Sequence, residues 1–431
     1  MIPEPALQPC NDERTARPGL PPELPSKWSW ATLGKVALFI NGDRGANYPK
    51  QSDYVGNGVA FVNTGHIEPS GRLALERMQY ISRASFDRLR SGKLMQGDIV
   101  YCLRGSTIGK TARVDFAEGA IASSLVIIRS KADISQDFLY YFLAGPFGQR
   151  FVKQLDNGSA QPNLSVAAIS KYPVPLPPLS EQRAIASILG ALDDKIELSR
   201  RMNETLEALA RALFQDWFAD ATQDDLPEGW RMGKLRDCCE RVENGGTPSR
   251  NVPDYWQPQE VPWLTSGEVR QKIVAATENF ISRAGLENSS AKLWQKETTV
   301  VALYGATAGQ VTLLGSEMCS NQACCALIPK PGWRFYVYLH TSSSIQALEQ
   351  QVRGSAQQNL SQQIVADLPT LLPDEHTIAK FDSVVAPFIE RWICNLFESC
   401  TLAALRDALL PKLLSGELRV PAAAKLAEAR A

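Results

Sequence analysis

The chain has 431 residues, of which 44% are hydrophobic and 21% charged, a composition typical of a soluble globular protein with two or three domains. No apolar run approaches the roughly 18 residues of a membrane span, and the first residues lack the apolar core of a signal peptide. Nine cysteines occur without a C-x-x-C pair, beside only three histidines. We therefore expect reduced thiols, a cytoplasmic location, no zinc site and no contact with a membrane.

The net charge of −1 is divided unevenly along the chain. Residues 26–175 hold 18 Lys and Arg against 11 Asp and Glu, a balance of +7, whereas residues 221–369 hold 13 against 15, a balance of −2. A basic first segment suits a polyanionic partner. The second segment would have to bind such a partner through the local placement of charge.

The first 25 residues contain seven prolines and little to bury, so we expect a disordered tail at 1–25. The following segment mixes short β-type runs near 58, 98 and 121 with an apolar helix at 135–143, which Gly145-Pro146 should end. The block GSAQPNLS (158–165) and a proline-rich lead then precede a long helical stretch.

This stretch, 180–217, has the seam of a coiled coil. Alternating steps of four and three residues give a period of 3.5, and at about 1.5 Å per residue the helix would be roughly 57 Å long. Polar Ser199 and Asn203 interrupt the seam. Its apolar members are Ile185, Leu189, Leu192, Ile196, Leu206, Ala210, Leu213 and Trp217.

The whole plan then occurs a second time. LPSKWSWATL at 24 returns as LPEGWRMGKL at 226, and GSAQPNLS returns as GSAQQNLS at 354. A second long helix follows, with apolar seam residues Phe381, Val385, Phe388, Trp392, Leu402, Leu409 and Leu413. The chain is thus an internal duplication of a unit of about 200 residues. We expect the two helices to pack antiparallel, with Ser199 opposite Ser399 and Asn203 opposite Asn395.

Two motifs suggest enzymes but do not fit. GSTIGKT (105–111) has three residues between its glycines where a P-loop has four, Arg104 stands in place of the first glycine, and the copy YGATAGQV (304–311) lacks lysine. We interpret both as tight glycine turns after a strand. PDYWQPQEVP (253–262) spaces Asp254 and Glu260 like a nuclease metal site, but Pro262 occupies the position of the required lysine. The sequence predicts no catalytic residue and no metal site.

Polar, glycine-punctuated loops remain in both copies. Arg, Asn, Gln, Ser and Thr are the side chains that hydrogen-bond base edges, and glycine lets the backbone approach phosphate. The candidates for DNA contact in the first copy are Arg44, Asn47, Tyr48, Asn63, Thr64, His66, Arg104, Ser106, Thr107, Lys110, Gln161 and Asn163. Those in the second copy are Thr247, Ser249, Arg250, Thr265, Ser266, Tyr304, Thr307, Gln310, Asn321, Gln322, Gln357 and Asn359.

The chain resembles the specificity subunits of type I restriction–modification enzymes. The resemblance covers about residues 26–420 and is carried by PLPPLSEQ with the helix after it, by NGGTPS…WLTSG, and by the closing LRDALLPKLLSGELRV. It implies a mixed α/β fold with two target-recognition domains, each reading one half of a bipartite DNA sequence, and two long antiparallel helices related by a pseudo-two-fold axis. The second lead, LPTLLPDEHTIAKF, departs from the family by lacking the EQ of the first.

The resemblance also implies partners and a domain plan. Two methylation subunits would supply S-adenosylmethionine chemistry, translocase–nuclease subunits would use ATP and Mg²⁺, and this non-catalytic chain would bind double-stranded DNA without a cofactor. The expected boundaries are a tail at 1–25, a first recognition domain at 26–175, a helix at 176–220, a second recognition domain at 221–370, a helix at 371–420 and a tail at 421–431. The alternatives are a stand-alone coiled-coil adaptor or DNA-binding protein without a restriction partner, and an NTPase or nuclease.

Overall fold

The computed structural model describes residues 23–155, 164–218, 226–345, 348, 350 and 359–420. Most of the predicted tail at 1–25 and all of the tail at 421–431 lie outside these ranges. The chain divides into two compact units, one made of Met1–Asp194 with Leu402–Ala431 and the other of Lys195–Thr401. Two long helices, α6 (Leu179–Phe218) and α11 (Glu375–Ser415), contribute one section each to both units.

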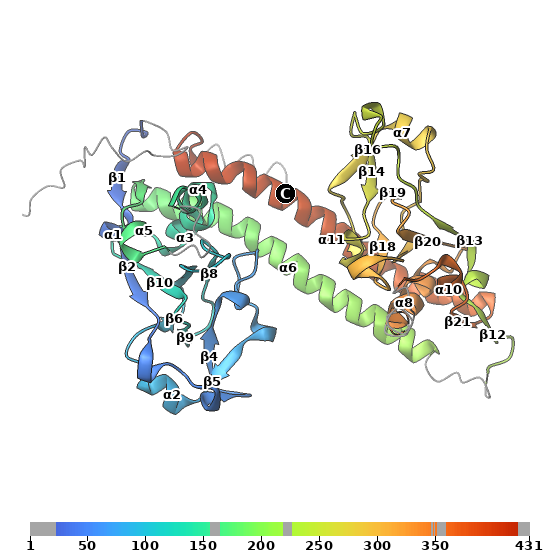
Figure 1. Cartoon of the computed structure of the whole chain (residues 1–431), viewed down its shortest axis with the longest axis horizontal. Helices are drawn as coiled ribbons and strands as arrows, with labels where there is room; N and C mark the ends of the chain where they lie inside the picture. Colours follow the sequence, from blue (N-terminus) through green and yellow to red (C-terminus); the bar gives the residue numbers. More distant parts are fainter. Residues whose placement is uncertain are drawn as a thin grey trace, which may run out of the picture. The chain divides into compact units, whose positions relative to one another are not determined.

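The first unit carries a mixed α/β domain, as the sequence predicts (Figure 1). Its strands are β1 (Ser29–Thr32), β2 (Ala37–Asn41), β3 (Tyr54–Val55), β4 (Val59–Val62), β5 (Gln79–Ile81), β6 (Lys93–Met95), β7 (Ile99–Cys102), β8 (Thr111–Arg113), β9 (Glu118–Ile121), β10 (Leu125–Ser130) and β11 (Pro173–Leu176). Its shorter helices are α1 (Leu33–Val36), α2 (Arg83–Arg88), α3 (Gln136–Ala144), α4 (Pro146–Leu155) and α5 (Val166–Ile169).

Two sheets form the core of this domain. A four-stranded sheet of order β2-β10-β7-β8 packs on a five-stranded sheet of order β3-β5-β4-β9-β6 through apolar residues of both, including Val62, Val100 and Ile127. The helix α2 covers the opposite face of the five-stranded sheet with Phe86. The four-stranded sheet lies on the side of α3 and α6 (Figure 1).

The second unit repeats these elements with different loop lengths. Its strands are β12 (Arg231–Lys234), β13 (Cys239–Asn244), β14 (Val261–Leu264), β15 (Ile273–Val274), β16 (Asn279–Ile281), β17 (Thr299–Ala302), β18 (Val311–Leu314), β19 (Cys319–Ser320), β20 (Cys324–Pro329) and β21 (Pro369–Leu372). Its shorter helices are α7 (Arg283–Glu287), α8 (Arg334–Ser343) and α10 (Gln362–Ala366). A sheet of order β13-β20-β17-β18-β15 packs on a three-stranded sheet of order β16-β14-β19 (Figure 1).

The recurring LP…W motif starts each copy in the same way. In each copy a short strand after the tryptophan pairs antiparallel with the proline lead of the following long helix, β1 with β11 and β12 with β21. The indole of Trp28 donates to Glu181 at 3.1 Å, and the indole of Trp230 donates to Asp374 at 3.0 Å. Both copies therefore fasten the first strand of the domain to the start of its long helix.

The EQ pair that the second copy lacks is Glu181 and Gln182, and both side chains form bonds within the first unit. Glu181 also pairs with Arg419 at 2.8 Å, and the buried amide of Gln182 bonds the backbone of Ser135 and Pro177. In the second copy Asp374 accepts the indole N–H of Trp230, as Glu181 accepts that of Trp28, and it also caps α11. Its hydrogen bonds from the Thr377 hydroxyl and backbone lower the pKa of Asp374 to about 2.

Within the second unit, α6 and α11 run antiparallel, as predicted. The amide of Asn395 donates to Asn203 at 2.8 Å, and both side chains are buried. Lys195 pairs with Glu398 at 3.1 Å on one side of this layer, and Trp217 packs edge-on against Phe381 on the other. Ser199 is buried and Ser399 half-buried. The Asn203–Asn395 pair of the predicted polar layer is therefore present in this unit, and the pairing of Ser199 with Ser399 stays a prediction.

The seam of α11 differs from the predicted one at a single position. Phe381, Val385 and Trp392 are buried as expected, but Phe388 is only half-buried and Ile389 is fully buried in its place. Two successive steps of four residues, from Phe381 to Val385 and from Val385 to Ile389, precede the step of three to Trp392, so the strict alternation of four and three is wrong at this position. Of the α6 positions in this unit, Ile196, Leu206 and Leu213 are half-buried.

In the first unit the seam residues Ile185, Leu189 and Leu192 of α6 and Leu402 and Leu409 of α11 are buried. Arg406, which interrupts the predicted apolar pattern, pairs with Asp193 at 2.8 Å. Asp193 pairs with Arg406 inside α11, and Glu181 near the start of α6 pairs with Arg419 just after the end of α11, so the two helix sections are antiparallel here too.

Two local predictions for the first domain need correction. The run at 121–129 is not one strand, because β9 ends at Ile121 and a turn at Ser123 and Ser124 precedes β10. The helix α3 ends at Ala144 as predicted, but Pro146 begins the new helix α4. Proline is favourable at a helix start, where its missing N–H needs no partner.

The two glycine turns have the predicted conformation. Gly105 and Gly109 have φ values of +84° and +85°, and Gly305 and Gly309 have +78° and +87°. Each turn leads into a strand, β8 or β18, whereas a P-loop leads into a helix whose amino end binds phosphate.

The Asn203–Asn395 layer gives a test of how the helices are paired. Replacing Asn395 by alanine leaves a buried amide without its partner, so we expect a loss of about 1–3 kcal/mol in the free energy of unfolding. Replacing both asparagines by leucine should be near neutral or stabilising, because neither position then holds an unpaired polar group. Urea unfolding of the full chain measures both, with S399A as a control close to wild type. Additive losses in the double variant would contradict the pairing.

The first glycine turn gives a second test. A Cβ at Gly105 meets nothing within 4 Å, so G105A should cost only the left-handed strain of about 1–2 kcal/mol. A Cβ at Gly109 lies 3.0 Å from Val152 Cγ2 and from Gln149 Oε1, so G109A should cost more. Gly305 is also open, and G305A is the matched control for G105A. Thermal unfolding ranks the three variants, and an equal loss at Gly105 and Gly109 would refute the assigned contacts.

Candidate nucleic-acid interface

Four loops of the first domain meet at one edge of its sheets, which we call the first loop edge (residues 42–48, 63–66, 103–107 and 122–124). They meet because β4 and β9 are parallel, whereas β10 is antiparallel to β2 and β7. The N–H of Ala122 donates to Val62 O at 2.8 Å, and the N–H of Leu103 donates to Ser124 O at 3.0 Å. Gly42 lies against the backbone of Ala122, where a Cβ would approach Ala122 O to 2.7 Å.

The candidates on the first loop edge differ in how free their side chains are. Arg44, Arg104 and Ser106 are exposed, and Arg44 reaches Ser123 O at 3.5 Å. Asn63 accepts from Gly65 N and donates to Gln79, so it holds its own loop. Asn47, Tyr48, Thr64, Thr107 and Lys110 are half-buried.

His66 lies inside this edge. It is buried, and its Nδ1 accepts from Asn63 N at 3.1 Å. Burial, together with the charge of Arg77, lowers the pKa of His66. The imidazole is therefore neutral near pH 7 and serves as a cap within the loop.

The second loop edge (residues 245–250, 265–268, 303–307 and 321–323) is built by the same backbone bonds. The N–H of Asn321 donates to Leu264 O at 3.1 Å and that of Leu303 to Ala323 O at 2.7 Å. Gly246 N donates to Ser320 O at 2.9 Å, and the Thr247 hydroxyl donates to Gln322. Candidates from four separate stretches of the sequence are thus brought together here.

Several polar groups of the second loop edge are used internally. Thr265 donates both its N–H and its hydroxyl to Glu268, and Asn321 accepts from Ala323 N. Exposed candidates are Ser249, Arg250, Tyr304, Gln322 and Asn359; half-buried ones are Thr247, Thr265, Ser266, Gln310 and Asn321; Thr307 is buried. The exposed members are the candidates whose side chains solvent can reach.

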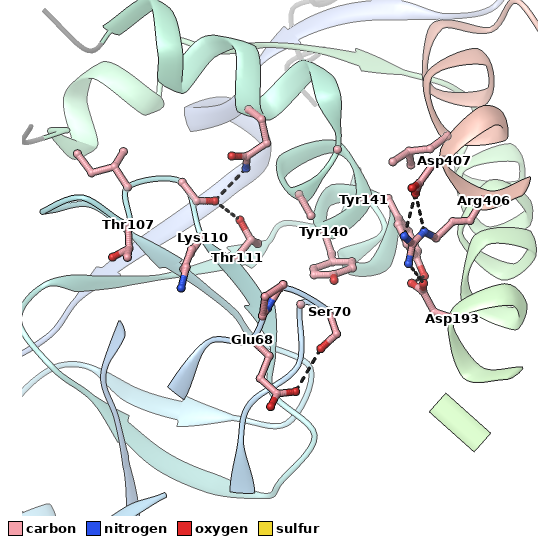
Figure 2. Close-up of a pocket in the computed structure, with 18 of the residues that line it drawn as sticks. Glu68, Ser70, Thr107, Lys110, Thr111, Tyr140, Tyr141, Asp193, Arg406 and Asp407 are labelled. Carbon is pink, nitrogen blue, oxygen red and sulfur yellow. Dashed lines mark hydrogen bonds and ion pairs between the residues drawn. The ribbon is translucent and has the colours of Figure 1, made fainter. Parts of the chain in front are cut away.

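A polar pocket of about 440 Å³ lies beside the first loop edge, between the first glycine turn and the helices of the same unit (Figure 2). Lys110 and Thr111 come from the turn, Tyr141 from α3, Asp193 from α6 and Arg406 from α11. Tyr141 donates to Asp193 at 2.8 Å, and Asp193 also pairs with Arg406. Burial, together with Asp193, raises the pKa of Tyr141, so its hydroxyl stays protonated and fixes the recognition domain to both helices.

The two acidic residues of the rejected metal motif, Asp254 and Glu260, take part in separate hydrogen bonds. Glu260 accepts from Arg283 N at 2.8 Å, and at Asp254 the backbone carbonyl accepts from Ser282 at 2.5 Å. Across the described residues there is no group of three His, Cys, Asp or Glu side chains that could hold a metal ion. In the same part of the chain no helix is long and apolar enough to cross a membrane.

Three candidates, Gln161, Asn163 and Gln357, lie outside the described residues. The flanking Leu164 and Leu360 each donate to the backbone ahead of a glycine turn, at Leu103 O and Leu303 O, both at 2.9 Å. Sequence reasoning missed Ser123, which occupies in the first copy the place of Gln322 in the second. The internal repeat was the signal that could have indicated Ser123. The bonds from Leu103 to Ser124 and from Leu303 to Ala323 are equivalent, so Ser123 aligns with Gln322.

The chain matches the family model of the type I restriction modification DNA specificity domain twice, over residues 25–208 and 227–385. It is 23% identical to the MjaIX specificity subunit of Methanocaldococcus jannaschii, over 92% of this chain and 95% of that protein. It is 24% identical to the HindI specificity subunit of Haemophilus influenzae, over 91% of this chain and all of that protein.

The fold is also similar to a solved structure. The S subunit of a type I restriction–modification system from M. genitalium aligns with a TM-score of 0.63 at 14% identity, covering 92% of this chain and 99% of that one. The two matched ranges together span more than half of the chain and include both loop edges. The chain therefore belongs to the type I restriction–modification DNA specificity domain family, of which it carries two domains.

Proposed function

We propose that this chain is the DNA-reading subunit of a type I restriction–modification complex and that each loop edge reads one half of a bipartite target. The observation that carries the proposal is the repeated convergence of polar loops on an equivalent edge of both domains. Equivalent scaffolds with different side chains suit the reading of two different half-sites. The +7 balance of residues 26–175 adds attraction to phosphate on the first domain.

The proposal assigns chemistry to partners. Two methylation subunits would supply S-adenosylmethionine, translocase–nuclease subunits would use ATP and Mg²⁺, and this chain would act without a cofactor, in the cytoplasm. The boundaries predicted from the sequence, 26–175 and 221–370 for the reading domains and 176–220 and 371–420 for the helices, are part of this proposal. The adaptor alternative offers no explanation for two loop edges that each carry exposed arginine.

The decisive experiment is a domain exchange. Replacing residues 26–172 by those of a relative should change one half of the methylated sequence and leave the other half intact, because each edge contacts its own stretch of DNA. Genomic methylation mapping of cells that carry the complex gives the readout. The reciprocal exchange of residues 226–369 is the matched control and should alter only the other half. Simultaneous change of both halves would reject independent reading.

The length of the helices should determine the unread spacer between the half-sites. Inserting four residues after Ser199 and four after Glu398 adds about one turn, or about 6 Å, to each helix, and B-DNA rises about 3.4 Å per base pair. The spacer should then grow by roughly one to two base pairs while both half-sites stay the same. Methylation mapping again measures the outcome.

The control is an insertion in one helix only. It shifts Asn203 away from Asn395 and should abolish most methylation, because the seam no longer matches. An unchanged spacer with full activity in the double insertion would show that the helices do not determine the spacing.

A further inference from the structure

The second loop edge contains an arginine that is held rigidly but has no polar partner. The guanidinium carbon of Arg250 lies 3.7 Å from the centroid of the Trp256 ring and 5.5 Å from that of Trp263. Arg250 is exposed, and among the described residues no hydrogen bond or ion pair engages its guanidinium. Its flat face is thus occupied by an indole, while its N–H donors are left to solvent.

The ring beneath Arg250 is itself fixed. Trp256 donates its indole N–H to Ser249 O at 3.1 Å and packs edge-on against Trp263, with centroids 5.2 Å apart. Trp263 belongs to β14, is buried, and donates its indole N–H to Gly246 O at 3.1 Å. A continuous set of contacts therefore joins the strand to the head of Arg250.

The backbone that carries Arg250 is equally constrained at the edge. Gly246 bonds to Ser320, and a Cβ at Gly246 would lie 2.3 Å from the backbone of Ser290, so the loop passes where a side chain cannot fit. Thr247 is bonded to Gln322 of the neighbouring turn. The loop that carries Arg250 is therefore fastened to the turn that contains Gln322.

The first domain contains an equivalent aromatic pair, with a different residue packed on it. Tyr54 packs edge-on against Phe61 as Trp256 does against Trp263, at an offset of 202 residues in both cases. Counting by the same offset, Tyr48 occupies the position of Arg250, and it too packs against Phe61. The aromatic support is repeated, whereas the residue at this position is the half-buried Tyr48 in one copy and the exposed Arg250 in the other. Such a difference is expected where two edges read different sequences.

We infer that Arg250 reads a guanine in the major groove of the second half-site and that Trp256 is the positioning residue that holds it. A guanidinium stacked by its face keeps its fork of in-plane donors free, and that fork matches the O6 and N7 acceptors of guanine. A phosphate contact needs no such support, because a mobile surface cation serves it equally well. Fixing the side chain before binding removes the entropy cost of ordering it on the base. This inference rests on the proposed function.

The test uses the methyltransferase complex of the full chain, after its target has been found by methylation mapping. Competition binding is measured against duplexes with every single base-pair change in both half-sites, at several salt concentrations. R250A should lose roughly 5- to 150-fold of the discrimination at one G·C pair of the second half-site and leave the first half-site unchanged. R250K should lose most of it as well, because an ammonium cannot form the bidentate pair.

Substitutions of Trp256 separate support from contact. W256F keeps an aromatic face but no indole N–H, and it should retain most of the discrimination at this base pair. W256A removes the support of Arg250, and it should lose as much discrimination as R250A does. R231A, an exposed arginine on β12 at the other end of the domain, is the matched control and should behave as wild type.

Three outcomes would overturn the inference. One is a uniform loss of affinity for all sequences, with the slope of log affinity against log salt reduced by about one phosphate contact. This result would make Arg250 a contact to the DNA phosphate backbone. The others are relaxation at an A·T pair or in the first half-site, and unchanged discrimination in R250A. If the wild-type complex shows no sequence preference at all, the proposed function itself fails, and this result is distinct from the three.

Discussion

Burial of the apolar seam of α6 and α11 is the constraint on which both units depend. In the second unit the core that contains the seam residues Phe381, Val385 and Ile389 also contains β-strand and α8 residues of the recognition domain, so the helices and the domain share one hydrophobic core. In the first unit polar groups also join the domain to the helices. Tyr141 of the domain donates to Asp193 of α6, and Asp193 pairs with Arg406 of α11. Because neither helix section has a core of its own, each domain is oriented by the helices that it covers.

The duplication preserves devices that position the chain and varies those that face solvent. Both tryptophans of the LP…W motif bond a carboxylate at the start of a long helix, although that carboxylate is Glu181 in one copy and Asp374 in the other. Both glycine turns keep their two left-handed positions. The residue that packs on this aromatic pair, by contrast, is Tyr48 in one copy and Arg250 in the other. Two domains that read different DNA sequences require this division, since the backbone geometry of the loop edge must stay constant while the side chains that face the DNA differ.

Polar residues at the loop edges fall into two groups with different physical roles. Asn63, His66, Thr265 and Asn321 bond their own loops, where a buried or half-buried polar group needs a partner. Exposed side chains such as Arg44, Arg104, Arg250 and Gln322 keep donors available. Residue type alone places both groups among the candidates for base contact, because the same amides and hydroxyls that read a base also cap a turn.

The sequence by itself determined the duplication, the two long helices, the strands near 58 and 98 and the polar pair at Asn203 and Asn395, because period and repeat are local or nearly local signals. It could not determine that Ile389 replaces Phe388 in the seam, since the choice between two neighbouring apolar residues depends on the surface that the helix packs against. Nor could it separate capping from exposed polar residues or find Ser123. Only the pairing of β4 with β9 and of β10 with β2 and β7 brings four distant loops to one edge. The stacking of Arg250 on Trp256 likewise exists only in three dimensions, because it depends on Trp263 being buried beneath both.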